Sequence, residues 1–399
     1  MDRWISLGGL GVMLLLAWLL SENRRRLHVR LIVSGIALQF VLAMLLLWSP
    51  PGQRVFEGAR VVVAQVLSFS NAGAEFVFGT SFQDHFVAFS VLPTIIFVSS
   101  LTALLFHAGI LQQLVKVMAR LMVWVMDVSG SESLCAAANV FVGMTEAPLA
   151  IRPYLASMTR SELMAMMTAG MSTIAGGVMA AYVGMGADAG HLLAASLMSA
   201  PAALVVAKIM VPEVDVSPTK GVVRVQVPKT DANLLDAACR GAADGLTLAL
   251  NVGAMLIAFI ALVAMFNWML GLFPDVAGQP LSLERMLGWV MAPLAWTIGV
   301  PWSEAQQVGM LLGKKTIFNE FLAYQDLIAM KDQLSPRSFT IATYALCGFA
   351  NFGSMGIMIG GIGGLVPSRR KDIAHYGFRA LIAGTIAVLM TACIAGVLI

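Results

Sequence analysis

Long stretches without a charged residue constrain the fold of this chain more than any other feature of its sequence. Asp, Glu, Lys and Arg are absent between Arg30 and Arg54, Asp84 and Lys116, Glu162 and Asp188, Asp188 and Lys208, Asp244 and Asp275, Arg337 and Arg369, and after Arg379. Several of these stretches reach the roughly 20 residues that a helix needs to cross the apolar core of a bilayer. The sequence therefore predicts an all-α polytopic membrane protein.

The composition argues against both an ordinary soluble domain and a nucleic-acid-binding protein. Hydrophobic residues make up 59% of the chain and charged residues only 12%, whereas soluble domains contain about 45–50% and about 25%. The net charge of +3 is too small to indicate a nucleic-acid partner, so we expect membrane lipid around the chain. The predicted core shows no His–acid dyad, no nucleophile with a base and no metal cluster, and we therefore expect no enzyme.

Basic residues beside the first two apolar runs predict the orientation of the chain. The first run, 4–20, is followed by Arg24, Arg25 and Arg26, and the second run, 30–49, crosses back. Since cytoplasmic loops carry the excess of Lys and Arg, the N-terminus is predicted to lie on the periplasmic side.

Two later polar connections, 213–236 and 365–374, are placed in the cytoplasm by the same rule. A last crossing, 376–398, then returns the C-terminus to the side of the N-terminus. The compact arrangement of spans is typical of a multi-pass protein of the bacterial inner membrane.

The N-terminal part, 1–84, is expected to contain two transmembrane helices and an interfacial helix. The stretch 54–80 is weakly amphipathic and punctuated by Gly and Ser, which favours a position at the membrane surface. Residues 85–109 form a long charge-free span, and 114–127 is a second amphipathic stretch. The remainder, 85–399, is expected to be the core of a single membrane-embedded unit.

An internal repeat indicates what this core does. Residues 129–186 and 304–364 both begin with an interrupted apolar segment that contains a Glu, Glu146 or Glu320, and both continue with a Gly-broken span. Corresponding interrupted segments in two halves of a chain are typical of transporter binding sites, because backbone groups exposed by a break must face a cavity or a ligand. The pattern predicts an inverted repeat with a solute pathway at the junction of its halves.

Glu146 and Glu320 are candidate site residues because a carboxylate inside a membrane costs about 2.5–3.5 kcal/mol or more. The alternative is a structural ion pair, with Arg152 for Glu146 and Lys315 for Glu320. Sequence offsets of six and five residues are poor for a pair on one helix, so a functional role is the favoured interpretation.

Asn351 and Ser354 share a helix face, because they lie one turn apart. Together with Glu320 they offer acceptors and mixed donor–acceptors suited to hydroxyl groups, and a sugar diol is a natural guest of such a pocket. The alternative is that both are interhelical hydrogen-bonding residues.

Asn139 and Thr173 form a second candidate group. Sodium prefers several hard oxygen ligands, which an Asn oxygen, a Thr oxygen and unwound backbone carbonyls supply without a formal charge. These two residues therefore mark a candidate cation site.

Four segments of the core resemble the concentrative nucleoside transporters, and the resemblance runs from about residue 85 to the end. The segments are GMTEAPLAIRPYL (143–155), MTAGMSTIAGGVMAAYVGMG (167–186), LLGKKTIFNEFLAY (311–324) and ALCGFANFGSMGIMIGGIGGLVPSRRKDIA (345–374). The resemblance implies a homotrimer with about eight transmembrane helices per protomer and an elevator-type shift of a transport domain. It further implies re-entrant helical hairpins at 130–155 and 305–330 and broken helices at 162–186 and 338–362.

The resemblance also implies roles for individual residues. Glu320, Asn351 and Ser354 would hold the ribose, with Phe349 packing beside it. The residues that would meet the nucleobase are Thr145, Glu146 and Val178.

The family's sodium site falls on the candidate cation group. It would use the side chains of Asn139 and Thr173 and the carbonyl oxygens of Val142 and Ile174.

One position departs from the family pattern, which usually reads Gly-Gln-Thr-Glu in the first hairpin. This chain has Met144 in place of the Gln, within Gly143-Met144-Thr145-Glu146. Gln donates and accepts hydrogen bonds, whereas the Met thioether donates none and accepts only weakly. We therefore expect Met144 to change which nucleobase is preferred.

The sequence predicts a secondary active transporter that imports nucleosides such as uridine by symport with sodium. Two alternatives stay open at this point. One is coupling to protons carried by Glu146 or Glu320, and the other is a membrane protein that binds nucleosides without transporting them.

Overall fold

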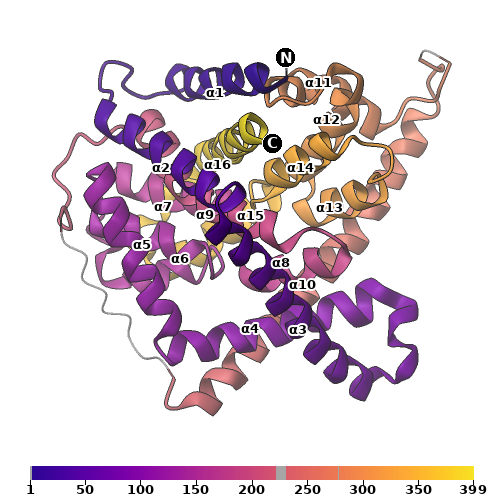
Figure 1. Ribbon diagram of the computed structural model, residues 1–399, viewed down its shortest axis with the longest axis horizontal. Coiled ribbons are helices and arrows are strands. Elements are labelled where there is room, and N and C mark those ends of the chain that lie inside the picture. Colours follow the sequence, from indigo (N-terminus) through magenta and orange to yellow (C-terminus); the bar gives the residue numbers. More distant parts are fainter. Residues whose placement is uncertain (1, 222–230, 277) are drawn as a thin grey trace.

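The computed structural model describes residues 2–221, 231–276 and 278–399, and Figure 1 shows how its helices are arranged. Its α-helices are α1 (Asp2–Leu19), α2 (Val29–Leu47), α3 (Pro50–Phe78), α4 (Leu92–His107), α5 (Ile110–Met126), α6 (Gly130–Asn139), α7 (Arg160–Ser172), α8 (Gly176–Met185), α9 (Ala189–Met210), α10 (Leu234–Leu270), α11 (Leu283–Thr297), α12 (Trp302–Ile317), α13 (Glu320–Ala329), α14 (Pro336–Leu346), α15 (Phe352–Leu365) and α16 (Arg370–Leu398). Shorter 3-10 or π-helical turns are η1 (Thr80–His85), η2 (Val87–Val91), η3 (Ala147–Tyr154) and η4 (Pro367–Arg369).

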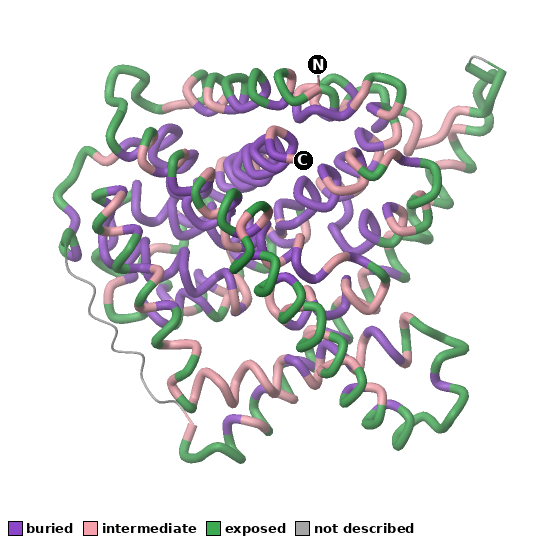
Figure 2. The backbone as a smooth tube through the Cα atoms, viewed as in Figure 1, coloured by how far each residue is buried: buried purple, intermediate pink, exposed green. Residues whose placement is uncertain are grey.

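The prediction of a polytopic helical membrane protein is confirmed. Among the described residues, eight helical segments are long and apolar enough to cross a membrane. They are Asp2–Leu19, Val29–Leu47, Pro50–Phe78, Val87–His107, Arg160–Met185, Ala189–Met210, Leu234–Leu270 and Pro367–Leu398. Their share of buried residues divides them into two classes. The segments that contain α7, α9 and α16 are 83–89% buried, whereas α3 and α10 are 11% buried and form the outside of the molecule (Figure 2).

The stretch 54–80, which is expected to lie at the membrane surface, is helical over most of its length, and its position relative to the membrane stays a prediction. It belongs to α3, an uninterrupted helix of 29 residues that is long and apolar enough for a crossing. Ser49 caps this helix by accepting a hydrogen bond from the Gly52 N–H, and prolines occupy its first turn, where no N–H partner is needed. The Gly and Ser residues that punctuate the stretch do not break the helix, because its backbone hydrogen bonds continue past them.

Two sets of helices follow one another in the same order along the chain. The first set is α6, η3, α7, α8 and α9, and the second is α12, α13, α14, α15 and α16. Breaks at 173–175 and 347–351 separate the paired helices α7/α8 and α14/α15. The second limb of the first hairpin, η3, is a 3-10 helix with Pro153 inside it, since proline removes an N–H donor that an α-helix needs.

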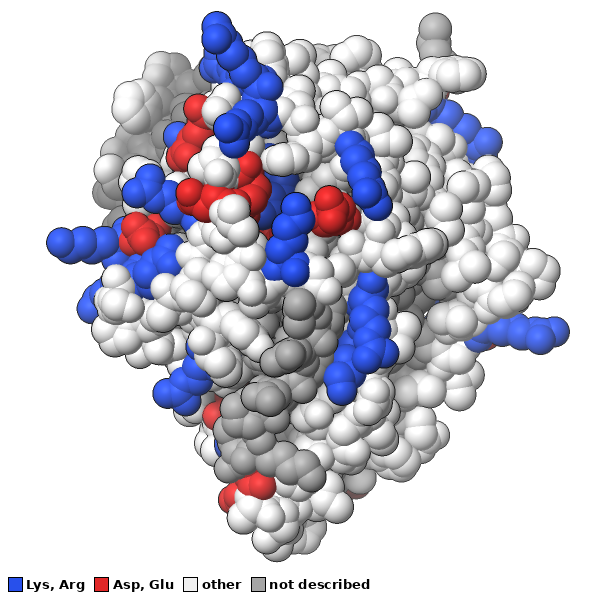
Figure 3. Space-filling view, turned by 90° about the vertical axis from the view of Figure 1, so that its left-hand side faces the viewer, with Lys and Arg blue, Asp and Glu red and all other residues white. Residues whose placement is uncertain are grey.

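Residues beside the segments predicted to be cytoplasmic contact one another, and residues 222–230 of the connection 213–236 lie outside the described residues. The Glu22 N–H donates to the Met210 carbonyl at 2.9 Å, and Arg379 pairs with Glu22 at 3.2 Å. Arg369 donates to the Met158 carbonyl at 2.6 Å. Figure 3 shows a face on which Asp and Glu lie among several Lys and Arg, beside a wide area with few charges.

The two ends of the chain also lie side by side (Figure 1). Arg3 Nε donates to the Ile399 carbonyl at 2.9 Å, and Arg337 Nη1 donates to the same oxygen at 2.7 Å. The shared location agrees with termini on one side of a membrane, and which side that is stays a prediction.

Candidate functional site

The two helix breaks touch each other near the middle of the fold. The Phe349 N–H in the second break donates to the Thr173 carbonyl in the first, at 3.3 Å. A Cβ at Gly348 would stand 3.0 Å from the Met171 carbonyl oxygen, so this close approach requires glycine. Backbone groups of both repeats therefore meet at one place, as the repeat predicted.

Glu320 is a buried carboxylate beside the two helix breaks, and two hydrogen bonds fix its position. It is the first residue of α13, directly after the cap residue Asn319, and its side chain is buried. Its Oε1 accepts a hydrogen bond from the Tyr182 hydroxyl at 2.8 Å, and its Oε2 accepts one from Asn351 Nδ2 at 2.8 Å. Both donors come from the broken helices, so the carboxylate joins the two repeats.

Asn351 has two partners at the start of α15. Its Oδ1 accepts a hydrogen bond from the Ser354 N–H at 2.7 Å and thereby caps the helix, while its amide donates to Glu320. The structure thus brings together the predicted group of Glu320, Asn351 and Ser354. Each carboxylate oxygen retains a lone pair after these contacts, so the group still has acceptors for hydroxyl hydrogens.

Tyr182 is a site residue that sequence reasoning missed. Its ring is fully buried and stacks on Tyr324 with a centroid distance of 4.3 Å, which fixes the hydroxyl against Glu320. The available signal was its position four residues after Val178, which places both residues on one face of α8. Val178 is itself buried.

The tip of the first hairpin contacts both broken helices. A Cβ at Gly361 of α15 would stand 2.7 Å from the Thr145 methyl carbon, and one at Gly170 of α7 would stand 2.9 Å from the Met144 Cβ. Phe349, in the opposite break, is half-buried. The hairpin tip therefore packs between α7 and α15, the helices that adjoin the two breaks.

The second predicted carboxylate, Glu146, has an exposed side chain whose Oε2 lies 3.4 Å from the Gly143 N–H. Neither Glu146 nor Glu320 forms an ion pair within the described ranges. Lys315 instead donates to the Ala345 carbonyl at 2.9 Å. The alternative of structural ion pairs with Arg152 and Lys315 is therefore not realised.

The candidate cation group contains a buried oxygen that lacks a partner. Asn139 Nδ2 donates to the Cys135 carbonyl at 3.0 Å, but Asn139 Oδ1 accepts no hydrogen bond in the described structure. Asn139 and Thr173 are both 1% exposed. A buried acceptor without a donor is costly, and a bound cation would satisfy it.

The two helices that carry this group reinforce its preference for a cation. Asn139 is the last residue of α6, and Thr173 is the C-cap of α7. The C-terminal end of a helix is the negative end of its dipole and stabilises positive charge. The Thr173 hydroxyl donates to the Ala169 carbonyl at 2.9 Å, which leaves its lone pairs free for a ligand.

Three segments of the chain match known families. Residues 8–81 and 191–396 match the N-terminal and C-terminal parts of a family described as Na⁺-dependent nucleoside transporter. Residues 88–189 match a family described as nucleoside recognition.

Similar proteins extend over the whole chain. Solute carrier family 28 member 3 of Rattus norvegicus is 44% identical over 100% of this chain and 59% of its own length. The uncharacterized transporter YutK of Bacillus subtilis is 42% identical over 99% of both chains. A structure of CNTnw in an inward-facing substrate-bound state aligns with a TM-score of 0.93 and 40% identity over 100% of this chain and 98% of that one. The chain spans about 58–61% of the length of the first solute-carrier relatives.

Proposed function

Since the chain belongs to the family of Na⁺-dependent nucleoside transporters, we propose that it imports nucleosides such as uridine by symport with sodium. The observation that carries this proposal is Glu320, a buried carboxylate oriented by Tyr182 and Asn351 where the two repeats meet. A fixed carboxylate accepts hydrogen bonds from two neighbouring hydroxyls, which a ribose presents. Ser354, one turn along α15 from Asn351, adds a hydroxyl to the same group.

Residues at the tip of the first hairpin form part of the proposed contact surface for the nucleobase. Thr145 and Glu146 supply polar groups and Val178 supplies apolar surface at the base, whereas Phe349 packs beside the ribose. Met144, which packs against Gly170, stands where the family usually has a hydrogen-bonding Gln.

Sodium as the coupling ion is supported by the unpartnered Asn139 Oδ1 at the C-terminal end of α6 and by the C-terminal end of α7, where a Cβ at Gly170 would stand 3.8 Å from that oxygen. The Thr173 oxygen and the carbonyls of Val142 and Ile174 complete an uncharged oxygen cage. In the alternative, proton coupling, Glu146 or Glu320 carries the proton and the cage plays no part.

The membrane assembly that we propose is a homotrimer in the bacterial inner membrane with an elevator-type mechanism. Its support is the largely unburied apolar surface of α3 and α10. Such surface is covered by lipid or by other copies of the chain.

Uptake of labelled uridine into proteoliposomes tests the proposed function. Vesicles are given an inward sodium gradient, a proton gradient or neither. Accumulation driven by sodium alone supports both the substrate and the ion. Accumulation driven by protons alone keeps the substrate and overturns the ion. Saturable binding without accumulation under any gradient identifies the chain as a nucleoside-binding protein that does not transport.

Met144→Gln is expected to narrow the range of accepted nucleosides. The Gln amide restores a donor and an acceptor at the base edge, and a site discriminates strongly only where it hydrogen-bonds its substrate. Competition of purine and pyrimidine nucleosides against labelled uridine measures the change. We expect the ratio of affinities between the best and worst bases to increase about tenfold, which corresponds to the free energy of about one hydrogen bond. An unchanged competition profile would show that Met144 does not face the base.

Tyr182→Phe is expected to weaken nucleoside binding about tenfold, because a hydrogen bond to a charged group contributes about 1.5–3 kcal/mol and water replaces part of it. The substitution keeps the stack on Tyr324. Tyr324→Phe is the matched control, since its hydroxyl donates to the Thr343 carbonyl rather than to Glu320. Equal nucleoside affinities of the two variants would contradict the role of Tyr182.

A further inference from the structure

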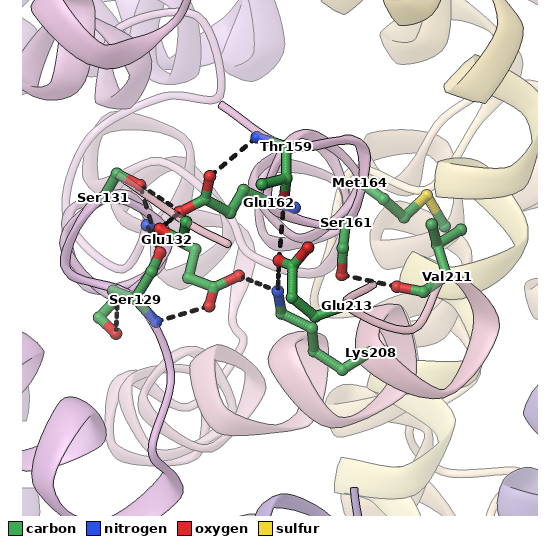
Figure 4. Close-up of polar contacts among 12 residues, drawn as sticks. Ser129, Ser131, Glu132, Thr159, Ser161, Glu162, Met164, Lys208, Val211 and Glu213 are labelled. Atoms are coloured by element: carbon green, nitrogen blue, oxygen red, sulfur yellow. Dashed lines mark hydrogen bonds and ion pairs between the residues drawn. The ribbon is translucent and has the colours of Figure 1, made fainter. Parts of the chain in front are cut away.

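A buried polar cluster lies at the far ends of the helices that carry the candidate cation group. We call it the Lys208 cluster, and its members are Glu132, Thr159, Glu162, Lys208 and Glu213 (Figure 4). None of them was singled out by the sequence pattern, and none contacts the candidate substrate residues.

Lys208 is the centre of this cluster. It lies in the last turn of α9, is 4% exposed, and its Nζ stands 2.7 Å from Glu132 Oε2 and 3.1 Å from Glu213 Oε2. Glu132 is 1% exposed. Buried charges persist only when they are paired, and removal of one partner costs about 3–5 kcal/mol. The ion pairs therefore fix the positions of α6, the end of α9 and the segment after α9 relative to one another.

The cluster fixes the starts of two helices at once. Glu132 Oε1 accepts from the Ser129 N–H at 2.7 Å in the capping box of α6, and Glu162 Oε2 accepts from the Thr159 N–H at 2.9 Å in that of α7. Ser131 donates to Glu162 Oε1 at 3.1 Å and so joins the first turns of the two helices directly.

A further contact ties these two starts to Lys208. Thr159 Oγ1 donates to Glu213 Oε2 at 2.8 Å, and the same carboxylate oxygen receives Lys208. The cap of α7 is thus connected to α9 through one oxygen, while α6 is connected to α9 through Glu132.

The other ends of α6 and α7 carry Asn139 and Thr173. The helices contain 10 and 13 residues, which makes them stiff rods of roughly 15 and 20 Å at 1.5 Å per residue. A change in the spacing of their first turns is carried to their last turns, because neither helix has a break between them. The separation of the two cation-facing oxygens therefore depends on the cluster.

We propose that Lys208, paired with Glu132 and Glu213, is a positioning residue that sets the geometry of the sodium site formed by Asn139 and Thr173. The inference rests on the proposed sodium symport and adds residues that contact neither ion nor nucleoside. Groups that hydrogen-bond directly to metal ligands change metal affinity 10–100-fold when they are replaced, and a contact at the opposite ends of the two helices is expected to act at the lower end of that range.

The test measures sodium and nucleoside dependence separately in proteoliposomes. The variants are Lys208→Met and the double variant Lys208→Met with Glu132→Gln, which leaves no unpaired buried charge from that pair and so retains the fold. For both we expect the sodium concentration for half-maximal uridine uptake to rise about tenfold. The KM for uridine at saturating sodium is expected to stay within about twofold of the wild-type value, because the Glu320 group is untouched.

Lys314→Met is the matched control. Lys314 pairs with Asp326 at 2.6 Å and with Glu284 at 3.6 Å, and neither partner lies on α6 or α7. The control is expected to leave the sodium requirement unchanged. Thermal unfolding of each purified variant, with and without sodium, supplies a readout independent of transport, and we expect the upward shift of Tm by sodium to shrink only in the Lys208 variants.

The outcomes separate this inference from the proposed function. A wild-type sodium requirement in a folded double variant overturns the positioning role and leaves sodium symport standing. A rise in the KM for uridine equal to the rise in the sodium requirement also overturns it, because it marks general damage. Wild-type uptake that ignores sodium overturns the proposed function itself and the inference with it.

Discussion

Glu320→Gln is expected to abolish concentrative nucleoside uptake while the protein still folds. The substitution keeps the size of the side chain but removes the negative charge and one of the two acceptors that the Tyr182 hydroxyl and the Asn351 amide orient. A hydrogen bond to a charged group contributes about 1.5–3 kcal/mol. Loss of one such bond and neutralisation of the other therefore lower the affinity for the ribose by about 10²–10³-fold, at about tenfold for every 1.4 kcal/mol.

Initial rates of uridine uptake at saturating sodium measure this effect. Glu75→Gln is the matched control, because Glu75 is an exposed carboxylate on α3 away from both helix breaks. Thermal unfolding of both variants checks that the fold is retained. Wild-type rates of uptake by Glu320→Gln would contradict the proposed role of this carboxylate in ribose binding.

Thr173→Val is expected to weaken sodium binding strongly. Valine has the shape of threonine but no hydroxyl, so one oxygen ligand of the proposed cage is lost while packing is kept. We expect the sodium concentration for half-maximal uptake to rise by about 100-fold. Replacement of outer-shell partners lowers metal affinity 10–100-fold, and loss of a direct ligand is expected to reach the upper end of that range. Sodium titration of uridine uptake measures the rise.

Thr168→Val provides a control that differs only in position. Thr168 lies on the same helix, is also fully buried, and its hydroxyl donates to the Met164 carbonyl at 2.8 Å, the same type of bond that Thr173 makes with Ala169 at 2.9 Å. Loss of that bond alone should leave the sodium requirement unchanged. Equal behaviour of the two Val variants would contradict a cation ligand at Thr173.

Local patterns were sufficient to predict the parts of the site that are defined along one helix. Charge-free stretches predicted the membrane helices, and Gly-rich interruptions predicted the breaks beside Thr173 and Asn351. Glu320 was identifiable because a carboxylate in an apolar membrane segment is energetically costly and is therefore usually functional. A shared pocket of Glu320, Asn351 and Ser354 was predicted from the chemistry of these groups, and the structure adds a direct hydrogen bond between Glu320 and Asn351.

Contacts between distant segments could not be predicted in this way. Tyr182 meets Glu320 across 138 positions of the chain, and a tyrosine in an apolar helix gives no sign of which carboxylate it faces. Lys208 ended a charge-free stretch and was treated as a boundary marker, although it is buried between Glu132 and Glu213.

The hydrogen bond between Phe349 and Thr173 joins the proposed nucleoside and sodium sites at a single peptide contact. Whichever ligand binds first orders part of the backbone that the other ligand needs, so the second pays a smaller entropic cost. Such cooperativity is reciprocal by thermodynamic necessity. The factor by which sodium lowers the dissociation constant of the nucleoside must equal the factor by which the nucleoside lowers that of sodium, and equilibrium titrations of either ligand in the presence of the other report the same number.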